Sequence, residues 1–541
     1  MNKKTTFKKR QKIFFLVSLL FLAILIGLWS YLESFKVEVK SIGGTYKEGI
    51  VGTPRFINPI LAQTQTDKDL TRLFFTPLLS PKEDGSFDNL LVESVEISPD
   101  KLKYRINLKK DIYFNDGVNL TAEDLLFTIE SIQDPLTKSP LESTWKGVSP
   151  KIIDKYSIEL TLPRPFGDFL SLLQIGVIPK HVWSKISPQE FIFSILNTKP
   201  VAYGPYSIKK IETRKDGSPT QYILKRYKNA VEQTNIKKIS LIFFENENNL
   251  IKGLKKNKID AAYGISPKLI NKIPKNYTVY SEKLPRVFAL FLNPAENTVL
   301  ESKKIRQALE LAIDKQSIVD TVFFSYASEI DSALGNMNFN IPYNPSEAEK
   351  LIEEEGWKKN EEGMYSKEIN KNTTLLSFDI ASPDIEEMKE VAEEIKANLA
   401  LIGVTVSTHF YEENNLTQNI IRPRNYDALL FGYEIERSSD LYSFWHSTQI
   451  SDPGLNVSLF KNTELDVALE QLRTGSDNTE KIENLINAGK PAIFLYSPSF
   501  IYAFPKNIKG ASISVTSAAD RFNSLRHWFS KTRHVWPFLI Q

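Results

Sequence analysis

The chain has 541 residues, of which 42% are hydrophobic and 25% are charged. This length exceeds what one hydrophobic core supports, so we expect two or three domains, and the composition is that of a globular protein. No cysteine occurs, which excludes disulfides, thiolate metal sites and a lipid attached to a cysteine.

A basic stub precedes an uncharged run from Ile13 to Leu32. As a helix this run is ~30 Å long, which is enough to cross a bilayer. The basic flank favours the cytoplasm and puts everything after Glu33 outside. A cleaved signal peptide is the alternative, but the residues after the apolar core offer no small-x-small cleavage site. We therefore expect a single-pass protein of the cell membrane, held in the lipid bilayer through residues 13–32, with its large C-terminal domain on the periplasmic or cell-surface side.

The basic stub also distorts the apparent charge of the protein. The whole chain has a net charge of +3, from 68 basic and 65 acidic residues. Without the six basic residues of the stub, 62 basic residues remain against the same 65 acidic ones, so the outer part is near −3. This balance gives no support to nucleic-acid binding. The six are Lys3, Lys4, Lys8, Lys9, Arg10 and Lys12.

A strand, a turn and a helix are predicted between residues 97 and 135. Apolar residues alternate with polar ones from Tyr104 to Leu108, as in a half-buried strand, and Asn115 to Gly117 then supply a turn that tolerates positive φ. Thr121 and Asp124 have the spacing of a capping box, and apolar residues recur at helical spacing until Pro135.

The order of these features, a DG turn followed by TAED at the start of an apolar helix, resembles the family 5 extracellular solute-binding proteins. These are the binding components of peptide and nickel ABC importers. The resemblance implies an α/β fold with two lobes, of the periplasmic-binding-protein type (type II, cluster C), with an extra subdomain. Other matching passages are PKH at 179–181, YGPY at 203–206, IDA at 259–261, RQA at 306–308, AIDK at 312–315 and IGV at 402–404.

The resemblance also divides the chain. We expect a cytoplasmic stub and anchor followed by a short tether, and then two lobes with crossovers near Leu284 to Arg286 and near Asn487 to Pro491. The aromatic tail from Ala519 to Gln541 is predicted to dock on lobe one, because free in solvent it would expose a large apolar group. The expected bounds are 1–12 stub, 13–32 anchor, 33–40 tether, 41–80 with 198–285 and 488–541 lobe one, 81–197 extra subdomain, and 286–487 lobe two.

Nothing in the sequence indicates catalysis. It contains no G-x-S-x-G elbow, P-loop or H-E-x-x-H motif. His527 and His534 are seven residues apart, a spacing that we interpret as a surface role and not as a metal site. We therefore expect no enzyme activity, no catalytic residue, no cofactor and no metal.

A ligand-binding loop is predicted after the buried strand that ends near Phe431. Relatives in the family carry here a glycine, an aromatic residue and an acid that pairs with the amino terminus of a bound peptide. By position Glu436 matches one such acid and Asp440 another, although Leu441 replaces the usual proline. An enclosed ammonium needs a carboxylate partner, since an unpaired buried charge is costly. Helix capping by the two acids is the alternative interpretation.

Further candidates for the binding site come from both lobes. The two aromatic candidates of lobe two either wall the ligand or pack in the core, and the amide of the same lobe is expected to hold the loop. The lobe-one candidates, in the passages 203–206 and 55–58, would present backbone groups to an extended ligand. These candidates are Tyr433, Trp445, Asn456, Tyr203, Tyr206 and Asn58.

Taken together, the sequence predicts a monomeric, membrane-anchored protein that captures oligopeptides between two lobes and hands them to an ABC transporter permease. One alternative is the same fold with a nonpeptide ligand, such as a metal chelate or an oligosaccharide. A second alternative is a surface sensor or chaperone without transport.

Overall fold

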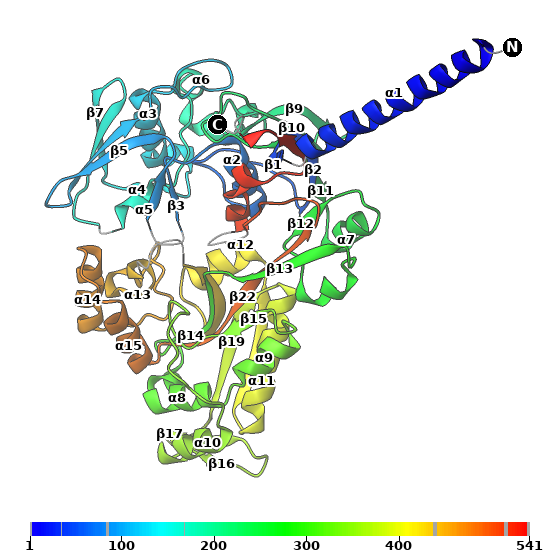
Figure 1. The fold of residues 1–541 in the computed structure, drawn as a ribbon. Coiled ribbons are helices and arrows are strands. Elements are labelled where there is room, and N and C mark those ends of the chain that lie inside the picture. Colours follow the sequence, from blue (N-terminus) through cyan, green and yellow to red (C-terminus); the bar gives the residue numbers. More distant parts are fainter. Residues whose placement is uncertain are drawn as a thin grey trace.

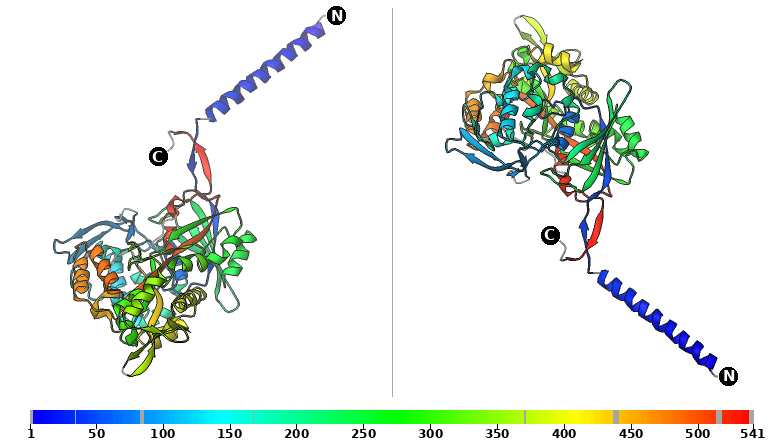
Figure 2. Two further views of the ribbon diagram at one scale, coloured as in Figure 1. Left: turned by 90° about the horizontal axis from the view of Figure 1, so that it is seen from below. Right: turned by 90° about the horizontal axis from the view of Figure 1, so that it is seen from above.

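The computed structural model describes residues 3–33, 35–82, 86–166, 168–369, 371–435, 441–512 and 518–537. The described residues form two α/β lobes, which are the upper and lower halves of Figure 1, and helix α1 (Lys3–Glu33) projects from the upper one. Figure 2 shows the same helix extending away from both lobes. The two-lobed α/β architecture expected from the sequence is therefore confirmed.

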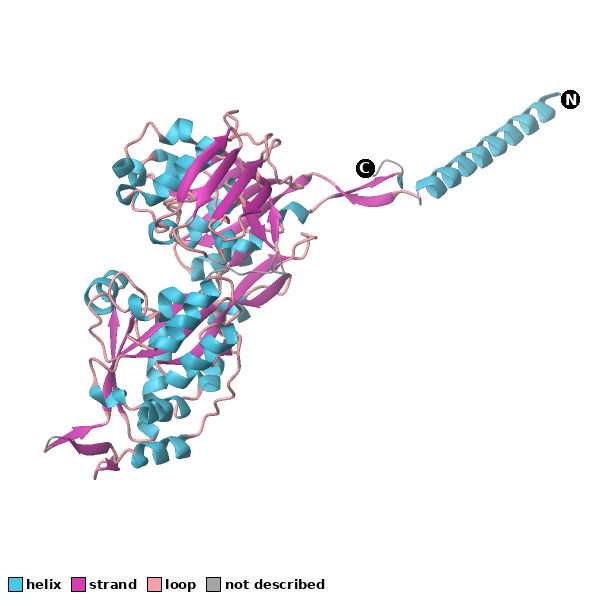
Figure 3. Ribbon diagram, turned by 90° about the vertical axis from the view of Figure 1, so that its left-hand side faces the viewer, coloured by secondary structure: helices cyan, strands magenta, loops and turns pink. Residues whose placement is uncertain are grey.

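One sheet runs through both lobes, as the side view in Figure 3 shows. Its strand order is β20-β19-β21-β14-β22-β12-β2-β11-β10-β9, and β13 and β15 pair with β22 outside this path. Strand β22 (Ala492–Pro505) is nearly all buried, because it lies at the centre of the sheet. It is the element that both lobes share.

Lobe one is the upper half of Figure 1. It contains β2, which follows the tether, and the edge of the sheet that ends in β9. Its elements are β2 (Gly43–Val51), α2 (Gln65–Phe74), β9 (Tyr206–Thr213), β10 (Pro219–Arg226), β11 (Ile236–Phe244), α7 (Glu247–Lys255), β12 (Ala261–Tyr263) and β13 (Tyr277–Lys283).

The subdomain beside lobe one contains the predicted strand, turn and helix. Helix α3 begins after Thr121, whose backbone N–H donates to the Asp124 carboxylate at 2.9 Å, and Gly117 has a φ of +92° in the turn. The prediction was local, and the structure confirms it. The elements are β3 (Leu79–Pro81), β4 (Phe87–Asn89), β5 (Val92–Ile97), β6 (Lys103–Leu108), α3 (Ala122–Gln133), α4 (Glu142–Trp145), β7 (Ser149–Asp154), β8 (Ser157–Thr161), α5 (Phe169–Leu172) and α6 (Lys180–Trp183).

Lobe two is built from one continuous stretch of chain. Its two expected helices are present, one capped by Asn344, whose side chain accepts from the Glu347 N–H, and the other stopped before Gly403. The elements are β14 (Arg286–Leu292), α8 (Lys303–Leu311), α9 (Lys315–Thr321), β15 (Ala327–Glu329), α10 (Pro345–Glu354), β16 (Lys358–Lys359), β17 (Tyr365–Ile369), β18 (Asn372–Leu375), β19 (Ser377–Pro383), α11 (Glu386–Leu401), β20 (Thr405–Tyr411), α12 (Glu413–Asn415), β21 (Ala428–Glu434), α13 (Tyr442–Trp445), α14 (Thr463–Arg473) and α15 (Thr479–Gly489).

A fully buried arginine joins the end of the chain to the core of lobe one. The Arg521 guanidinium donates to Glu48 on β2 and to both carboxylate oxygens of Asp69 on α2, each at 2.7 Å. The Tyr46 and Tyr502 hydroxyls also donate to Glu48. All three charged side chains have no exposed surface. Loss of the arginine would be costly, because both buried carboxylates would then lack a cation.

The aromatic tail docks on lobe one only in part. Phe522, Leu525 and Trp528 are buried in the lobe-one core, as predicted. After Phe529 the chain leaves the lobe, and β23 (Thr532–Val535) pairs antiparallel with β1 (Val37–Lys40). The expected free tether is thus one strand of a two-stranded ribbon between α1 and lobe one. Phe538, Leu539 and Ile540 lie outside the described residues.

Candidate functional site: the boundary between the lobes

The chain crosses between the lobes twice, and the two crossings lie side by side. Strand β13 ends at Lys283 and β14 begins at Arg286, and both pair with β22. Within β22, residues up to Tyr496 pair with β14 of lobe two, and residues from Ser499 on pair with β13 of lobe one. Proline stands in each crossing, at positions 285 and 498.

The second crossing therefore lies further along the chain than the expected 487–491. The reason is that β22 is a single 14-residue strand, apolar and buried on both sides of the crossing, so no change in composition marks the boundary. The two crossings are hydrogen-bonded to each other: Ser497 Oγ donates to the Leu284 carbonyl at 2.7 Å, and the Leu284 N–H donates to the Pro498 carbonyl at 3.0 Å. They form one compact hinge.

A group of charged side chains lies beside this hinge. The Glu434 carboxylate, at the end of β21, accepts from the Arg286 guanidinium at 3.1 Å. The Lys68 ammonium on α2 of lobe one lies 3.8 Å from the same carboxylate. These side chains remain partly exposed. Glu434 is thus a lobe-two acid that faces lobe one. A sequence pattern does not show that α2 lies opposite it.

The two acids that the sequence singled out, Glu436 and Asp440, lie outside the described residues. The residues on either side of these acids are described. The Ile435 N–H donates to the carbonyl of Pro285 in the hinge at 2.7 Å, and the Leu441 side chain is buried in lobe two. The loop therefore begins at the hinge, directly after Glu434.

Tyr433 and Trp445 pack in the interior of lobe two. The Tyr433 ring stacks on Phe444 with 4.5 Å between ring centroids, and its hydroxyl donates to the Ala333 carbonyl. Burial raises the pKa of this phenol well above its usual value, and the Glu483 carboxylate raises it further. Trp445 packs against Phe291 and Phe494. In this structure the core role, one of the two that the sequence allowed, accounts for both rings.

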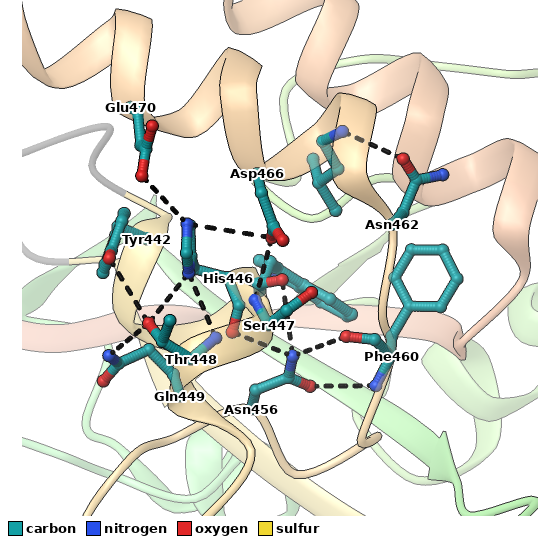
Figure 4. Close-up of polar contacts among 12 residues, drawn as sticks. Tyr442, His446, Ser447, Thr448, Gln449, Asn456, Phe460, Asn462, Asp466 and Glu470 are labelled. Atoms are coloured by element: carbon teal, nitrogen blue, oxygen red, sulfur yellow. Dashed lines mark hydrogen bonds and ion pairs between the residues drawn. The ribbon is translucent and has the colours of Figure 1, made fainter.

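Asn456 is buried and holds the segment that follows α13 (Figure 4). Its amide nitrogen donates to the carbonyls of Phe460 at 2.9 Å and of Trp445 and His446 at 3.3 Å. Its amide oxygen accepts from the Phe460 N–H at 3.3 Å. These bonds tie separate stretches of backbone after α13 to one side chain, and the loop with Glu436 and Asp440 that Asn456 was expected to hold lies outside the described residues.

The lobe-one candidates Tyr203, Tyr206 and Asn58 are also buried. The Tyr203 hydroxyl accepts from the Val177 N–H at 2.7 Å, and the Tyr206 hydroxyl donates to the Ile236 carbonyl at 2.8 Å. Asn58 donates to the Asn197 side chain at 3.2 Å and accepts from the Ile60 N–H. Their side chains are thus occupied by the protein itself, and only neighbouring backbone groups remain for a ligand.

The subdomain also contacts lobe two, at some distance from the hinge. The Arg473 guanidinium on α14 lies 3.7 Å from the centroid of the Tyr442 ring and 5.8 Å from that of Phe166 in the subdomain. The Tyr442 ring also stacks on His446, at 4.1 Å between centroids. The boundary is therefore framed by the hinge at one end and by this aromatic and cationic stack at another.

The comparison with protein families decides the class of this protein. The sequence profile of the bacterial extracellular solute-binding proteins, family 5 Middle, matches residues 87–452, which is more than half of the chain. The chain belongs to this family. Family 5 solute-binding proteins are binding components and not enzymes, and the expected class is therefore confirmed.

Individual relatives cover nearly all of this family 5 protein. The oligopeptide-binding protein AppA of Bacillus subtilis is 25% identical over 90% of this chain and 92% of its own. The structure of that protein with a nonapeptide has a TM-score of 0.72 and 23% identity, and covers 91% of this chain and 99% of its own. NikZ of Campylobacter jejuni, in complex with Ni(L-His), has a TM-score of 0.73 and 25% identity over 90% of this chain and 99% of its own.

The sequence of this family 5 protein contained only a weak signal for the charged group at the hinge. Glu434 follows Gly432 and Tyr433 directly, whereas the family pattern has two residues between the aromatic residue and the acid and therefore selects Glu436. Among the residues that the structure describes, no group of three or more metal-ligating side chains comes together. The described surface of the boundary thus offers charged and backbone groups and no preformed metal site.

Proposed function

We propose that this protein is a membrane-anchored, extracytoplasmic receptor that captures oligopeptides between its lobes and delivers them to an ABC transporter permease. The observation that carries the proposal is the similarity to AppA over nearly the full length of both chains. AppA has the same fold, and its structure was determined in complex with a nonapeptide. A peptide fits a boundary of this kind, because backbone pairing gives affinity with little dependence on side chains.

The ligand's amino terminus is the part that a carboxylate would recognise. Glu434 already has Arg286 and Lys68 as neighbours, so its charge is balanced by the protein. Glu436 and Asp440 follow on the loop that starts at the hinge, and we propose one of them as the partner of the ligand's ammonium. Tyr433, Trp445 and Asn456 then act as the support of this loop, and Tyr203, Tyr206 and Asn58 as the support of lobe-one backbone.

Anchoring is supported by α1. Residues Phe14–Glu33 form a helix that is long and apolar enough to cross a membrane, and none of this window is buried against the rest of the protein. The exposed side chains include Phe14, Phe21 and Trp29. An apolar helix that the protein leaves uncovered is satisfied by a lipid environment.

The two crossings support the proposed closure by a hinge. Both are short, both contain proline and both lie next to each other, so a small backbone rotation at these positions moves lobe two as a body against lobe one. A bound peptide would stabilise the closed arrangement by contacting both lobes at once.

Mass spectrometry of the ligand that copurifies with the full-length protein tests the proposed function. We expect oligopeptides of mixed sequence, released on denaturation. Recovery of a nickel chelate or an oligosaccharide instead would replace the peptide by another solute on the same fold. Intact mass of the membrane-extracted protein tests the anchor, since a mature chain that begins after Trp29 and is removed by a carbonate wash would contradict it.

A further inference from the structure

One end of the lobe-one sheet lies at the foot of the ribbon. Strand β2 begins at Gly43, directly after the ribbon strand β1, and Gly43 is paired with Ile236 at the start of β11. The end of β10 follows alongside, and Arg226 on it is paired with Tyr206 at the start of β9. In Figure 1, β9 and β10 accordingly lie near the base of α1. We call this the ribbon end of lobe one.

A groove of about 890 Å³ lies at the ribbon end, against the edge strand β9. The described residues that line it include several basic side chains and no acidic one. A site with this balance suits a polyanion or an array of phosphates, because each phosphate contact releases a condensed counterion or gains an ammonium partner. The basic side chains are Lys199, Lys209, Lys210, Lys225, Arg226 and Lys228.

Among the described residues, little of this charge is neutralised. Lys210 is paired with Glu212 at 2.8 Å, and Arg226 donates to the Gln233 amide, which is neutral. The nearby acid Glu232 is buried and paired with Arg72 at 3.0 Å. At the foot of the ribbon, burial, and then the charges of Arg526 and Lys40, lower the pKa of His527.

Exposed apolar side chains stand next to the groove in sequence. Phe193 and Ile195 are 81% and 63% exposed, and they precede Lys199 by only a few residues. Soluble surfaces bear single exposed apolar residues without consequence, but an aromatic and an aliphatic residue beside a basic groove form the combination that a lipid interface stabilises.

We propose that the basic groove at the ribbon end binds the anionic headgroups of the same membrane that holds α1, with Phe193 and Ile195 entering the interface beside it. The inference rests on the anchoring stated under Proposed function. The ribbon is the argument for lipid as the source of the phosphate, because its four paired residues span only about 13 Å. A tether this short keeps the ribbon end close to the headgroups at high effective concentration. The groove then sets the tilt of the lobes over the bilayer.

The test uses the full-length protein in nanodiscs of phosphatidylcholine alone or of an equal mixture with phosphatidylglycerol. The chain has no cysteine, so a single Asn229→Cys, at an exposed position beside Lys228, takes a donor dye without other labelling. With an acceptor in the headgroup layer, single-molecule energy transfer distinguishes lowered molecules, whose groove lies against the headgroups, from raised molecules, whose groove lies away from them. The measurement therefore gives the ratio of lowered to raised molecules. We expect phosphatidylglycerol to increase the lowered population.

Two variants separate charge from fold. Replacing Lys199, Lys209, Lys225 and Lys228 by Gln should reduce the ratio of lowered to raised molecules by at least about tenfold in the mixed nanodiscs. The matched control replaces four exposed lysines of lobe two and should leave the ratio unchanged. Phe193→Ser with Ile195→Ser should reduce it at constant charge. The control lysines are Lys303, Lys350, Lys358 and Lys461.

Each other outcome overturns the inference in a recognisable way. Equal ratios in both lipid compositions would show that the groove does not recognise anionic lipid. Binding of inorganic phosphate that is lost in the four-lysine variant, without any lipid dependence, would make the groove a site for a soluble anion. Failure of the protein to remain in nanodiscs at all would instead refute the anchor, and this result is seen before any energy transfer is measured.

Discussion

The two lobes differ in the sequence separation between the partners of their buried ion pairs. In lobe one, Arg521 is separated by more than 450 residues from Glu48 and Asp69, which it neutralises. In lobe two, the buried Lys315 is paired with Glu310 and with Asp331, within about 20 positions of itself, and Lys490 adds a second cation to Glu310. Lobe one therefore reaches its stable form only when the C-terminal segment has returned, whereas the ion group of lobe two lies within one continuous segment.

This contrast also separates the two lobes in function. Lobe one carries the ribbon and helix α1, and its buried ion group joins residues from near both ends of the chain. Lobe two is one continuous segment that is attached through the compact hinge. A body of this kind can move as a unit without disturbing the ion group that holds the other lobe together.

Loss of the long-range ion group is the strongest way to break this comparison. Arg521→Met should lower the free energy of unfolding of lobe one by roughly 4 kcal/mol, because two buried carboxylates lose their cation. Peptide-resolved hydrogen exchange on the full-length protein should show faster exchange throughout lobe one and little change in lobe two. The matched Lys315→Met should show the reverse. Equal acceleration in both lobes by either variant would contradict the separation.

The pair between Arg72 and Glu232 provides a smaller effect within lobe one, with a defined pH dependence. Burial alone would raise the pKa of Glu232, but the charge and hydrogen bonds of Arg72, together with Thr76, lower it below the usual value. A carboxyl whose folded-state pKa is lowered stabilises the fold above its unfolded-state pKa of about 4.3, and this contribution is lost as the pH falls through the folded-state value.

Glu232→Gln should therefore cost about 3 kcal/mol at pH 7. Denaturation curves recorded between neutral and acid pH should show a shallower acid loss of stability in the variant than in the natural protein. A variant whose acid profile ran parallel to that of the natural protein would show that Glu232 is not the group responsible.

Ligand binding tests the division of labour between the lobes. Glu436→Gln or Asp440→Asn should weaken peptide binding by about 30-fold, because a carboxylate facing an ammonium in an enclosed site contributes on the order of 2 kcal/mol. Calorimetry with free and N-acetylated peptides should show that acetylation costs a similar amount in the natural protein and much less in the responsible variant. If acetylation did not weaken peptide binding to the natural protein, neither acid would be the partner of the ligand's amino group.

The smallest effect is expected at the contact between Lys68 and Glu434, which joins the lobes across 3.8 Å of partly exposed surface. Lys68→Met should change the peptide affinity by no more than about threefold, since exposed ion pairs contribute little. Small-angle scattering should still show a smaller radius of gyration at saturating peptide. No compaction in either protein would mean that the hinge does not close on the ligand.

Local patterns in the sequence predicted the elements whose partners lie nearby. The capping box of Thr121 and Asp124 and the cap at Asn344 depend only on residues within one turn, and both are present. Family resemblance supplied the two lobes. The hinge position at Pro498 was missed, because β22 is uniformly apolar on both sides of it.

The site was less predictable than the fold for the same physical reason. Tyr433 and Trp445 have the residue type of a binding wall, but partners that bury them, such as Ala333 and Phe291, come from distant segments that no local pattern specifies. The neighbours of Glu434 are 148 residues away at Arg286 and still further away at Lys68. The proposed roles of Glu436 and Asp440 stay predictions.

The ribbon of β1 and β23 makes the connection between α1 and lobe one stiffer than a single strand would be. A single connecting strand would let the lobes spin about the membrane normal, whereas two paired backbones resist twisting against each other. In the proposed closure, lobe one is the stationary part of the protein and lobe two the part that moves. In the proposed transport cycle, a stiff connection would narrow the range of directions from which lobe two approaches the transporter, so that a docking partner need search over fewer angles.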